Sequence, residues 1–201
     1  MSLLRSLVRQ VTDQTLGYRL NQFVFARQIR YLRRLVQRLD LARDGVVVDI
    51  GCGIGDFSDL FPADRYLGID VLPQYVEWAQ KARRRNFEVC GFEAIETLRQ
   101  PVAAAFGIGI LHHMDDALIE KGMAGLARKL PVGGRVFFVE PCWPRQHWNL
   151  LGLMLRKLDR GAFIRDEVAY RRALGPRFQM SISEVHSVFP LDYHAFLLMR
   201  S

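Results

Sequence analysis

The stretch VVVDIGCGIGDF, residues 46–57, decides the fold of this chain. Three valines lead into an aspartate, and three glycines then alternate with single side chains. A short apolar run of this kind is typical of a buried strand, and the glycines after it permit a tight turn whose backbone a ligand can touch. We therefore expect a buried strand over 46–50, a ligand-binding turn, and a short helix that begins after Gly55.

Downstream of this stretch, short apolar runs alternate with helical patterns. Near-continuous apolar strands separated by helices indicate a parallel sheet that is covered on both faces. The alternation of strands and helices ends after Pro141, where two predicted helices precede the two final strands. The predicted strands are 46–50, 65–70, 87–90, 102–109, 135–141, 177–187 and 193–200, and the predicted helices are 73–85, 92–99, 115–130, 148–159 and 163–174.

Size and composition fit one globular domain with a sizeable core. The chain has 201 residues, of which 50% are hydrophobic and 24% are charged. No apolar run is long enough for a membrane helix, and arginines interrupt the N-terminus where a signal peptide has its apolar core. The three cysteines are widely spaced and fit neither a disulfide framework nor a zinc site. We predict a cytoplasmic protein without a metal.

The positive charge is concentrated at the N-terminus. The net charge is +7, and residues 1–40 hold eight arginines and two acidic residues. Helical patterns over 3–11 and 20–40 predict an N-terminal helical cap of residues 1–40, with an arginine stripe at Arg27, Arg30, Arg34 and Arg38. An anionic substrate, a membrane surface or a nucleic acid would suit this charge, and so would a simple solvated surface.

The polar residues at the strand ends point to a particular ligand. Asp70 ends the second strand, 19 residues after Gly51, where an acid can accept hydrogen bonds from ribose hydroxyls. Asp49 ends the first strand and is placed to hold a cationic amino group. The spacing G-x-G-x-G differs from the G-x-G-x-x-G of dinucleotide sites. A ribose joined to a cationic amino acid describes S-adenosyl-L-methionine (SAM) better than NAD.

Four motifs resemble those of the class I SAM-dependent methyltransferases. VVDIGCGIG is similar to the first motif of that family and YLGIDVLPQYVEWAQ to the second. AAFGIGILHHMDD is similar to the motif at the fourth strand, and LARKLPVGGRVFFVEP to the helix and strand before the substrate region. The resemblance covers residues 40–141 in detail. It implies a Rossmann-like, seven-stranded, mostly parallel sheet with helices on both faces and an antiparallel last strand, over residues 41–201.

The resemblance also implies a set of cofactor-binding residues. Asp49 and the glycine turn would hold the methionine end of SAM, Asp70 the ribose, and the residues after it the adenine. Many relatives carry an acid directly after the glycine that follows the third strand, whereas here Phe92 stands at that place, so we expect its ring or backbone groups to contact the adenine. The implied cofactor-binding residues are Asp49, Gly51, Cys52, Gly53, Gly55, Asp70, Val71, Leu72, Phe92, Ile110 and Leu111.

Three residues near the expected methyl group are candidates for a catalytic role. His112 and His113 follow the fourth strand and can act as a general base near neutral pH, and Glu140 ends the fifth strand. Methyl transfer from a sulfonium already has an excellent leaving group, so alignment of the nucleophile without any base is the alternative.

The segment after the fifth strand is expected to form a substrate region, a helical insertion at 142–176. Its apolar residues suit a hydrophobic channel, and Arg160 or Arg165 suits an acidic head group. We therefore predict a methyltransferase that converts SAM to S-adenosyl-L-homocysteine (SAH) and acts on O or C of a small apolar or lipid-like acceptor, with peripheral membrane contact. The alternatives are an RNA methyltransferase, which GILHH after the fourth strand disfavours, and a non-catalytic SAM-binding regulator.

Overall fold

The computed structural model describes residues 28–41, 45–159, 161–175 and 177–201. The chain divides into two compact units, Met1–Arg38 and Leu39–Ser201. In the first unit, residues 28–38 are helical and carry three of the four arginines of the predicted stripe. The helix expected over 3–11, the start of the helix expected over 20–40, and Arg27 lie outside the described residues.

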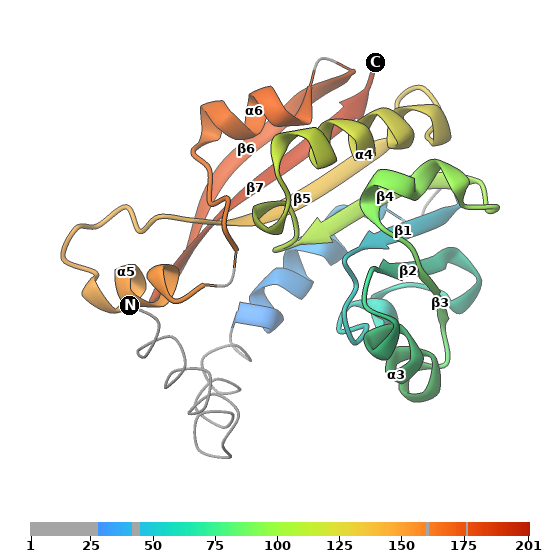
Figure 1. The fold of residues 1–201 in the computed structure, drawn as a ribbon, viewed down its shortest axis with the longest axis horizontal. Helices are drawn as coiled ribbons and strands as arrows, with labels where there is room; N and C mark the ends of the chain where they lie inside the picture. Colours follow the sequence, from blue (N-terminus) through green and yellow to red (C-terminus); the bar gives the residue numbers. More distant parts are fainter. Residues whose placement is uncertain (1–27, 42–44, 160, 176) are drawn as a thin grey trace. The chain divides into compact units, whose positions relative to one another are not determined.

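Seven strands in the described part of the second unit form one sheet in the order β3-β2-β1-β4-β5-β7-β6 (Figure 1). The strands β1 to β5 pair in parallel, and β1 lies in the middle of them, between β2 and β4. This confirms the mostly parallel sheet. The strands are β1 (Val46–Ile50), β2 (Tyr66–Asp70), β3 (Asn86–Val89), β4 (Val102–Ile108), β5 (Arg135–Cys142), β6 (Phe178–Val188) and β7 (Leu191–Arg200).

The last strand runs against its neighbours, as expected. β7 inserts between β5 and β6 and pairs antiparallel with both, so that Cys142 lies opposite Asp192. The hairpin of β6 and β7 therefore turns at the same sheet edge where the parallel strands have their carboxyl ends. Ligands of open α/β sheets bind at that edge.

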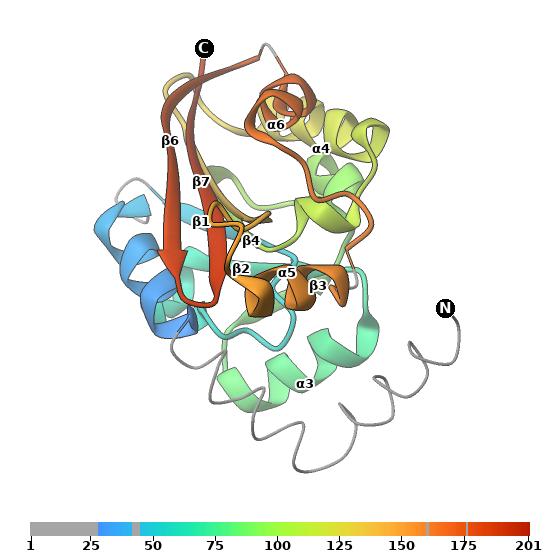
Figure 2. The ribbon, with the colours of Figure 1, turned by 90° about the vertical axis from the view of Figure 1, so that its left-hand side faces the viewer.

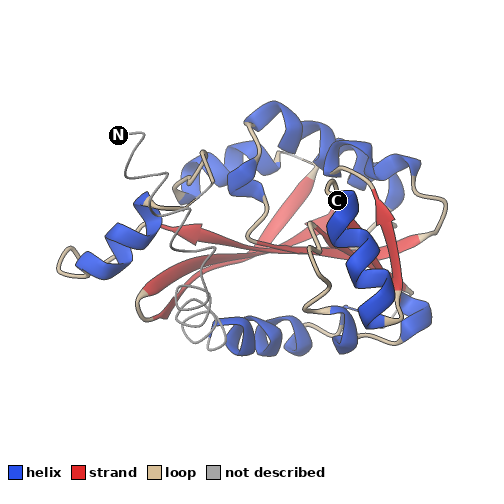
Figure 3. Ribbon diagram, turned by 60° about the horizontal axis from the view of Figure 1, so that its bottom comes forward, coloured by secondary structure: helices blue, strands red, loops and turns tan. Residues whose placement is uncertain are grey.

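Helices cover both faces of the sheet (Figure 3). α4 packs on the short helix η4 and on α6 over one face, and the buried residues of these helices join one apolar cluster with strand residues such as Ile50 and Phe138. α3 packs on β2 and β3. The elements are α3 (Pro73–Arg83), η4 (Phe92–Thr97), η5 (Leu111–His113), α4 (Asp116–Lys129), α5 (Leu150–Lys157) and α6 (Glu167–Leu174).

Two helices predicted from the sequence are shorter and tighter than expected. The segment after Gly55 contains only three-residue 3-10 turns, at Ser58–Leu60 and Ala63–Arg65, so no α-helix begins at the glycine turn. The segment expected as a helix over 92–99 is the 3-10 helix η4. In a 3-10 helix side chains at i and i+3 eclipse, which lets both Phe92 and Ile95 enter the core.

No helix in the described ranges is long and apolar enough to cross a membrane.

Candidate cofactor and methyl-transfer site

The glycine turn after β1 depends on backbone conformations that favour glycine. Gly51, Gly53 and Gly55 have φ angles of +70°, +53° and +73°. A Cβ atom on Gly51 would overlap the side chain of Ile110, whereas a Cβ on Gly53 would meet nothing within 4 Å. The turn therefore packs tightly against the end of β4 on one side and leaves its backbone open at Gly53.

Asp70 connects this turn to the end of β2. Its Oδ2 accepts a hydrogen bond from the backbone N–H of Gly53 at 2.9 Å, and its Oδ1 accepts one from Leu72 at 2.9 Å. A carboxylate has room for about four hydrogen bonds, so two acceptor directions remain for a ligand. Val71 and Leu72, directly after it, are 59% and 38% exposed, so apolar surface is available beside the carboxylate.

Asp49 lies beneath the turn and is 2% exposed. Its Oδ2 accepts a hydrogen bond of 2.7 Å from the hydroxyl of Tyr66, a partner that the sequence reasoning missed. Burial raises the pKa of Asp49 to about 7, against the effect of the Tyr66 hydrogen bond and with help from the charges of Asp70 and Asp56. A cation above the turn would favour the ionised carboxylate.

Besides Asp49, three of the residues expected at the cofactor are enclosed: Cys52, Phe92 and Leu111, whose side chain is fully buried in the core and so does not line a ligand pocket as expected. Cys52 is buried, and its sulfur lies close to Gly68, so it fills the turn. Phe92 is 2% exposed and packs on Gly122 and against the ring of Phe138, with 6.1 Å between ring centroids. The expectation that the Phe92 ring stacks on adenine is therefore corrected, because the ring belongs to the core.

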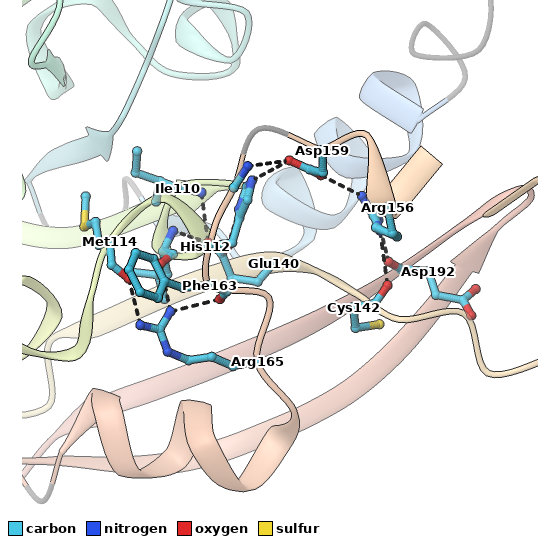
Figure 4. A network of polar contacts seen from close by, with 12 residues as sticks. Ile110, His112, Met114, Glu140, Cys142, Arg156, Asp159, Phe163, Arg165 and Asp192 are labelled. Carbon is cyan, nitrogen blue, oxygen red and sulfur yellow. Dashed lines mark hydrogen bonds and ion pairs between the residues drawn. The ribbon is translucent and has the colours of Figure 1, made fainter. Parts of the chain in front are cut away.

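The turn after β4 is held by Glu140 of β5. Glu140 is fully buried, and its Oε1 accepts hydrogen bonds from the backbone N–H groups of Ile110 and Leu111 at 3.0 and 2.9 Å. Its Oε2 accepts from the N–H of His112 at 3.1 Å and lies 2.9 Å from His112 Nδ1 (Figure 4). With four partners, Glu140 is a structural acceptor and not an open base.

His112 lies between two carboxylates. Its Nε2 is 3.4 Å from Oδ1 of Asp159, on the far side of the ring from Glu140 (Figure 4). Burial lowers the pKa of His112, but the hydrogen bonds and charges of Asp159 and Glu140 more than offset this and raise it to about 9. Both ring nitrogens of His112 thus face carboxylates that favour its protonated form, and this geometry argues against the expected role of His112 as a general base.

His113 differs from its neighbour. It is exposed, and its ring lies against that of His112 with 4.0 Å between centroids. The structure therefore separates the three catalytic candidates, because His112 and Glu140 are enclosed partners of each other and His113 alone of the three faces solvent.

A strap formed by Asp159 and residues 161–165 crosses the turn after β4. The N–H of Phe163 donates to His112 O at 3.0 Å, and the Arg165 guanidinium donates to Leu111 O and Met114 O at 3.1 and 2.7 Å. The ring of His112 also lies so close to Gly161 that a Cβ there would overlap it. Arg165 is occupied by these carbonyls, so it does not serve as the expected binder of an acidic head group, and Arg160 lies outside the described residues.

A family model for a methyltransferase domain matches residues 47–134, from β1 to the turn before β5. The match covers the glycine turn, Asp70 and the turn after β4. Residues 47–134 therefore form a methyltransferase domain, and the chain is similar to the class I SAM-dependent methyltransferases. In this methyltransferase the matched span ends before Glu140 and before α5 and the strap.

Solved structures resemble the methyltransferase in fold over most of its length. One is a magnesium protoporphyrin IX methyltransferase from Synechocystis PCC 6803 with bound SAH, with a TM-score of 0.65, 17% identity, and coverage of 98% of this chain and 99% of that chain. Another is a geranyl diphosphate C-methyltransferase from Streptomyces coelicolor A3(2), with a TM-score of 0.62, 16% identity, and coverage of 87% and 80%. No curated protein sequence matches the chain at a significant level.

Proposed function

We propose that the carboxyl edge of β1, β2 and β4 binds SAM, and that the enzyme transfers its methyl group to O or C of a small apolar or lipid-like acceptor. The observation that carries the proposal is Asp70, which is fixed to the glycine turn through Gly53 and keeps free acceptor directions for ribose hydroxyls. Val71 and Leu72 supply exposed apolar surface for the adenine. Ile110 packs on Gly51, and we assign it to the wall beside the methionine portion.

The electrostatics of the turn favour a cationic ligand. Asp49, Asp56 and Asp70 lie near one another, and their mutual repulsion contributes to the raised pKa of Asp49. A cationic amino group at the turn lowers that pKa again, so binding releases a proton from the fraction of Asp49 that is protonated at neutral pH. Asp49 acts here by its charge from beneath the turn, because its carboxyl group is buried and bonded to Tyr66.

The chemistry at the turn after β4 is alignment. When bound, SAM supplies a methyl group on a sulfonium and leaves as SAH. Glu140 and Arg165 fix the backbone of residues 110–114, so they hold the wall against which the acceptor must lie. His113, exposed at the end of this turn, is the candidate to contact the acceptor and take its proton.

The acceptor side of the proposal is supported by the insertion after β5. Trp143, Trp148, Leu150 and Met154 expose between 47% and 72% of their surface near the carboxyl edge of the sheet. Such exposed apolar surface suits an apolar acceptor. The arginines of the N-terminal unit, Arg30, Arg34 and Arg38, are proposed to attract an anionic or membrane-resident acceptor.

Calorimetry tests the cofactor assignment. We expect SAM and SAH to bind with micromolar dissociation constants, about −8 kcal/mol, and NAD to bind far more weakly. Titrations at pH 7 in two buffers of different ionisation enthalpy should reveal proton release on SAM binding, which the Asp49→Asn variant should lose. Binding of NAD as tight as that of SAM would contradict the proposal.

Turnover tests the role of His113. Mass spectrometry of reactions with candidate acceptors should detect a gain of one methyl group, which distinguishes an enzyme from a SAM-binding regulator. If His113 is the base, His113→Gln should reduce turnover about 100-fold while SAM affinity stays unchanged. Near-normal turnover of this variant would leave alignment alone as the source of catalysis.

A further inference from the structure

The helix α5 has its polar and apolar sides reversed relative to an ordinary surface helix. Its buried residues are Gly152 and Arg156. Leu150, Met154 and Leu158, spaced four residues apart, are 72%, 51% and 39% exposed. An amphipathic helix on a globular protein normally turns its apolar stripe to the core, whereas this stripe has no such cover from the residues that the structure describes.

The inward side of the helix is fixed by specific polar contacts. The Arg156 guanidinium donates to Cys142 O at 3.1 Å and to Asp192 O at 2.8 Å. At the start of the helix, Asn149 Nδ2 donates to Pro190 O at 2.9 Å, and a Cβ on Gly152 would overlap that same carbonyl oxygen. The helix therefore cannot roll to bury its leucines without losing these bonds.

Aromatic and basic residues accompany the apolar stripe. We define the α5 face as Trp148, Leu150, Leu151, Met154 and Leu158, all of them exposed. Arg145 and Lys157 are exposed beside it, and no acidic residue occurs between residues 142 and 158. A helix with leucines on one side, tryptophan at its end and basic residues at its margins is typical of helices that lie in the plane of an anionic membrane surface.

The α5 face lies at the edge of the sheet that carries the proposed site. α5 follows the carboxyl end of β5 and packs at the turn between β6 and β7 (Figure 2). The strap that follows it reaches His112 through Asp159, and Asp159 is also 3.4 Å from Arg156. A surface bound by α5 would thus lie next to the turn after β4, where the acceptor is proposed to lie.

We propose that the α5 face docks the enzyme on an anionic lipid surface and so presents the carboxyl edge of the sheet to a membrane-resident acceptor. The docking step stands on the orientation and charge of α5, whereas the role for the acceptor rests on the proposed function. A lipid surface fits these observations better than a protein partner. The face is a single exposed apolar stripe flanked by basic groups, and an anionic bilayer supplies both an apolar interior for the stripe and negative charge for the basic groups.

Vesicle co-sedimentation of the full chain tests the docking step. At low salt we expect binding to vesicles of phosphatidylcholine and phosphatidylglycerol in equal amounts, and little binding to phosphatidylcholine alone. High salt should weaken the binding. The double variant Leu150→Gln/Met154→Gln should lower the partition coefficient about tenfold or more, because both side chains lose apolar area that would enter the lipid.

A matched control removes equally exposed apolar side chains elsewhere. Val132 precedes β5 and is 77% exposed, and Val168 of α6 is 67% exposed. Val132→Gln/Val168→Gln should bind vesicles like the unmodified protein. Equal loss in the control and the α5 variant would overturn the proposal, and so would unchanged binding of the α5 variant. A third variant, Arg30→Gln/Arg34→Gln/Arg38→Gln, separates the N-terminal unit: if it alone abolishes binding, the assignment to α5 is wrong.

Tryptophan fluorescence reports the depth of insertion at α5 itself. In a Trp78→Phe/Trp143→Phe background only Trp148 remains. Its emission should shift to the blue with anionic vesicles and not with neutral ones. Absence of a shift despite vesicle binding would overturn the proposal, as would light scattering that shows a dimer which Leu150→Gln/Met154→Gln dissociates. SAM calorimetry on every variant keeps a failure of docking distinct from a failure of the proposed function.

Discussion

Asp70 and Glu140 are two carboxylates at the carboxyl ends of strands in one sheet, and the structure uses them in opposite ways. Asp70 accepts two backbone hydrogen bonds and borders exposed Val71 and Leu72. Glu140 accepts three backbone hydrogen bonds, pairs with His112 and is fully buried. The number of partners already present thus distinguishes a carboxylate that can bind a ligand from one that holds the turn beside it.

Removal of Glu140 should produce the largest effect. In Glu140→Ala, three backbone N–H groups and the ring of His112 lose their acceptor, and we expect the free energy of unfolding to fall by about 3–5 kcal/mol. Urea unfolding followed by circular dichroism measures it. Glu96→Ala is the control, because Glu96 pairs with Arg128 at the surface and its loss should cost about 1 kcal/mol or less. Equal stability of the two variants would show that Glu140 does not stabilise the fold more than a surface carboxylate does.

The His112 imidazolium gives the Glu140 region a pH dependence. The pKa of His112 is about 9 in the folded protein, above its ordinary value of 6.5, so its contribution is complete below pH 6.5 and is lost as the pH rises through 9. The shift corresponds to about 3 kcal/mol. Stability should therefore fall more steeply between pH 6.5 and 9 in the unmodified protein than in His112→Gln. An NMR titration that places this pKa below 7 would contradict the assignment and restore His112 as a base.

Substitution of Asp70 should affect binding more than folding. In Asp70→Asn one oxygen becomes an amide nitrogen, which cannot accept a hydrogen bond from Gly53 or from a ribose hydroxyl. We expect SAM to bind about 10- to 100-fold more weakly, while the free energy of unfolding falls by about 1 kcal/mol. Calorimetry and urea unfolding measure the two effects, with the exposed Asp64→Asn as control. A loss of stability as large as that of Glu140→Ala would make Asp70 a structural acceptor as well.

The smallest expected effect is at the apolar margin of Asp70. Leu72→Ala removes part of the surface proposed for the adenine, and burial of that surface in the complex predicts a two- to fivefold weaker affinity for SAM, about 0.5–1 kcal/mol. Val132→Ala, at an exposed residue before β5, should leave the affinity unchanged. Equal affinities of the two variants would place the adenine elsewhere.

The sequence predicted the sheet and the glycine turn because both depend on local patterns. Apolar strands, the acid at the end of β2 and the spacing of glycines are each visible within a few residues. It also predicted the antiparallel last strand, through the family resemblance. The helix expected after Gly55 was wrong, because the glycine conformations lead into 3-10 turns that a helical pattern cannot distinguish from an α-helix.

The state of the candidate catalytic groups could not be predicted, because it depends on contacts distant in sequence. His112 meets Asp159 across 47 residues of chain, and Arg165 reaches Leu111 across 54. No periodic pattern in the sequence indicates either contact. The same holds for Phe92, whose enclosure depends on Gly122 of α4 and Phe138 of β5. Residues of this kind are recognised only once the elements that carry them are assembled.

Glu140 lies on β5, and its position in the chain limits where this domain can be interrupted during synthesis or recombined during evolution. The span that matches the family model ends at residue 134. The backbone N–H groups of residues 110–112, however, donate to Glu140 of β5, which lies beyond that span. A nascent chain that has emerged from the ribosome only as far as residue 134 therefore still lacks the acceptor that holds the turn after β4. Exchange of that segment between related enzymes should likewise succeed only when β5 travels with it.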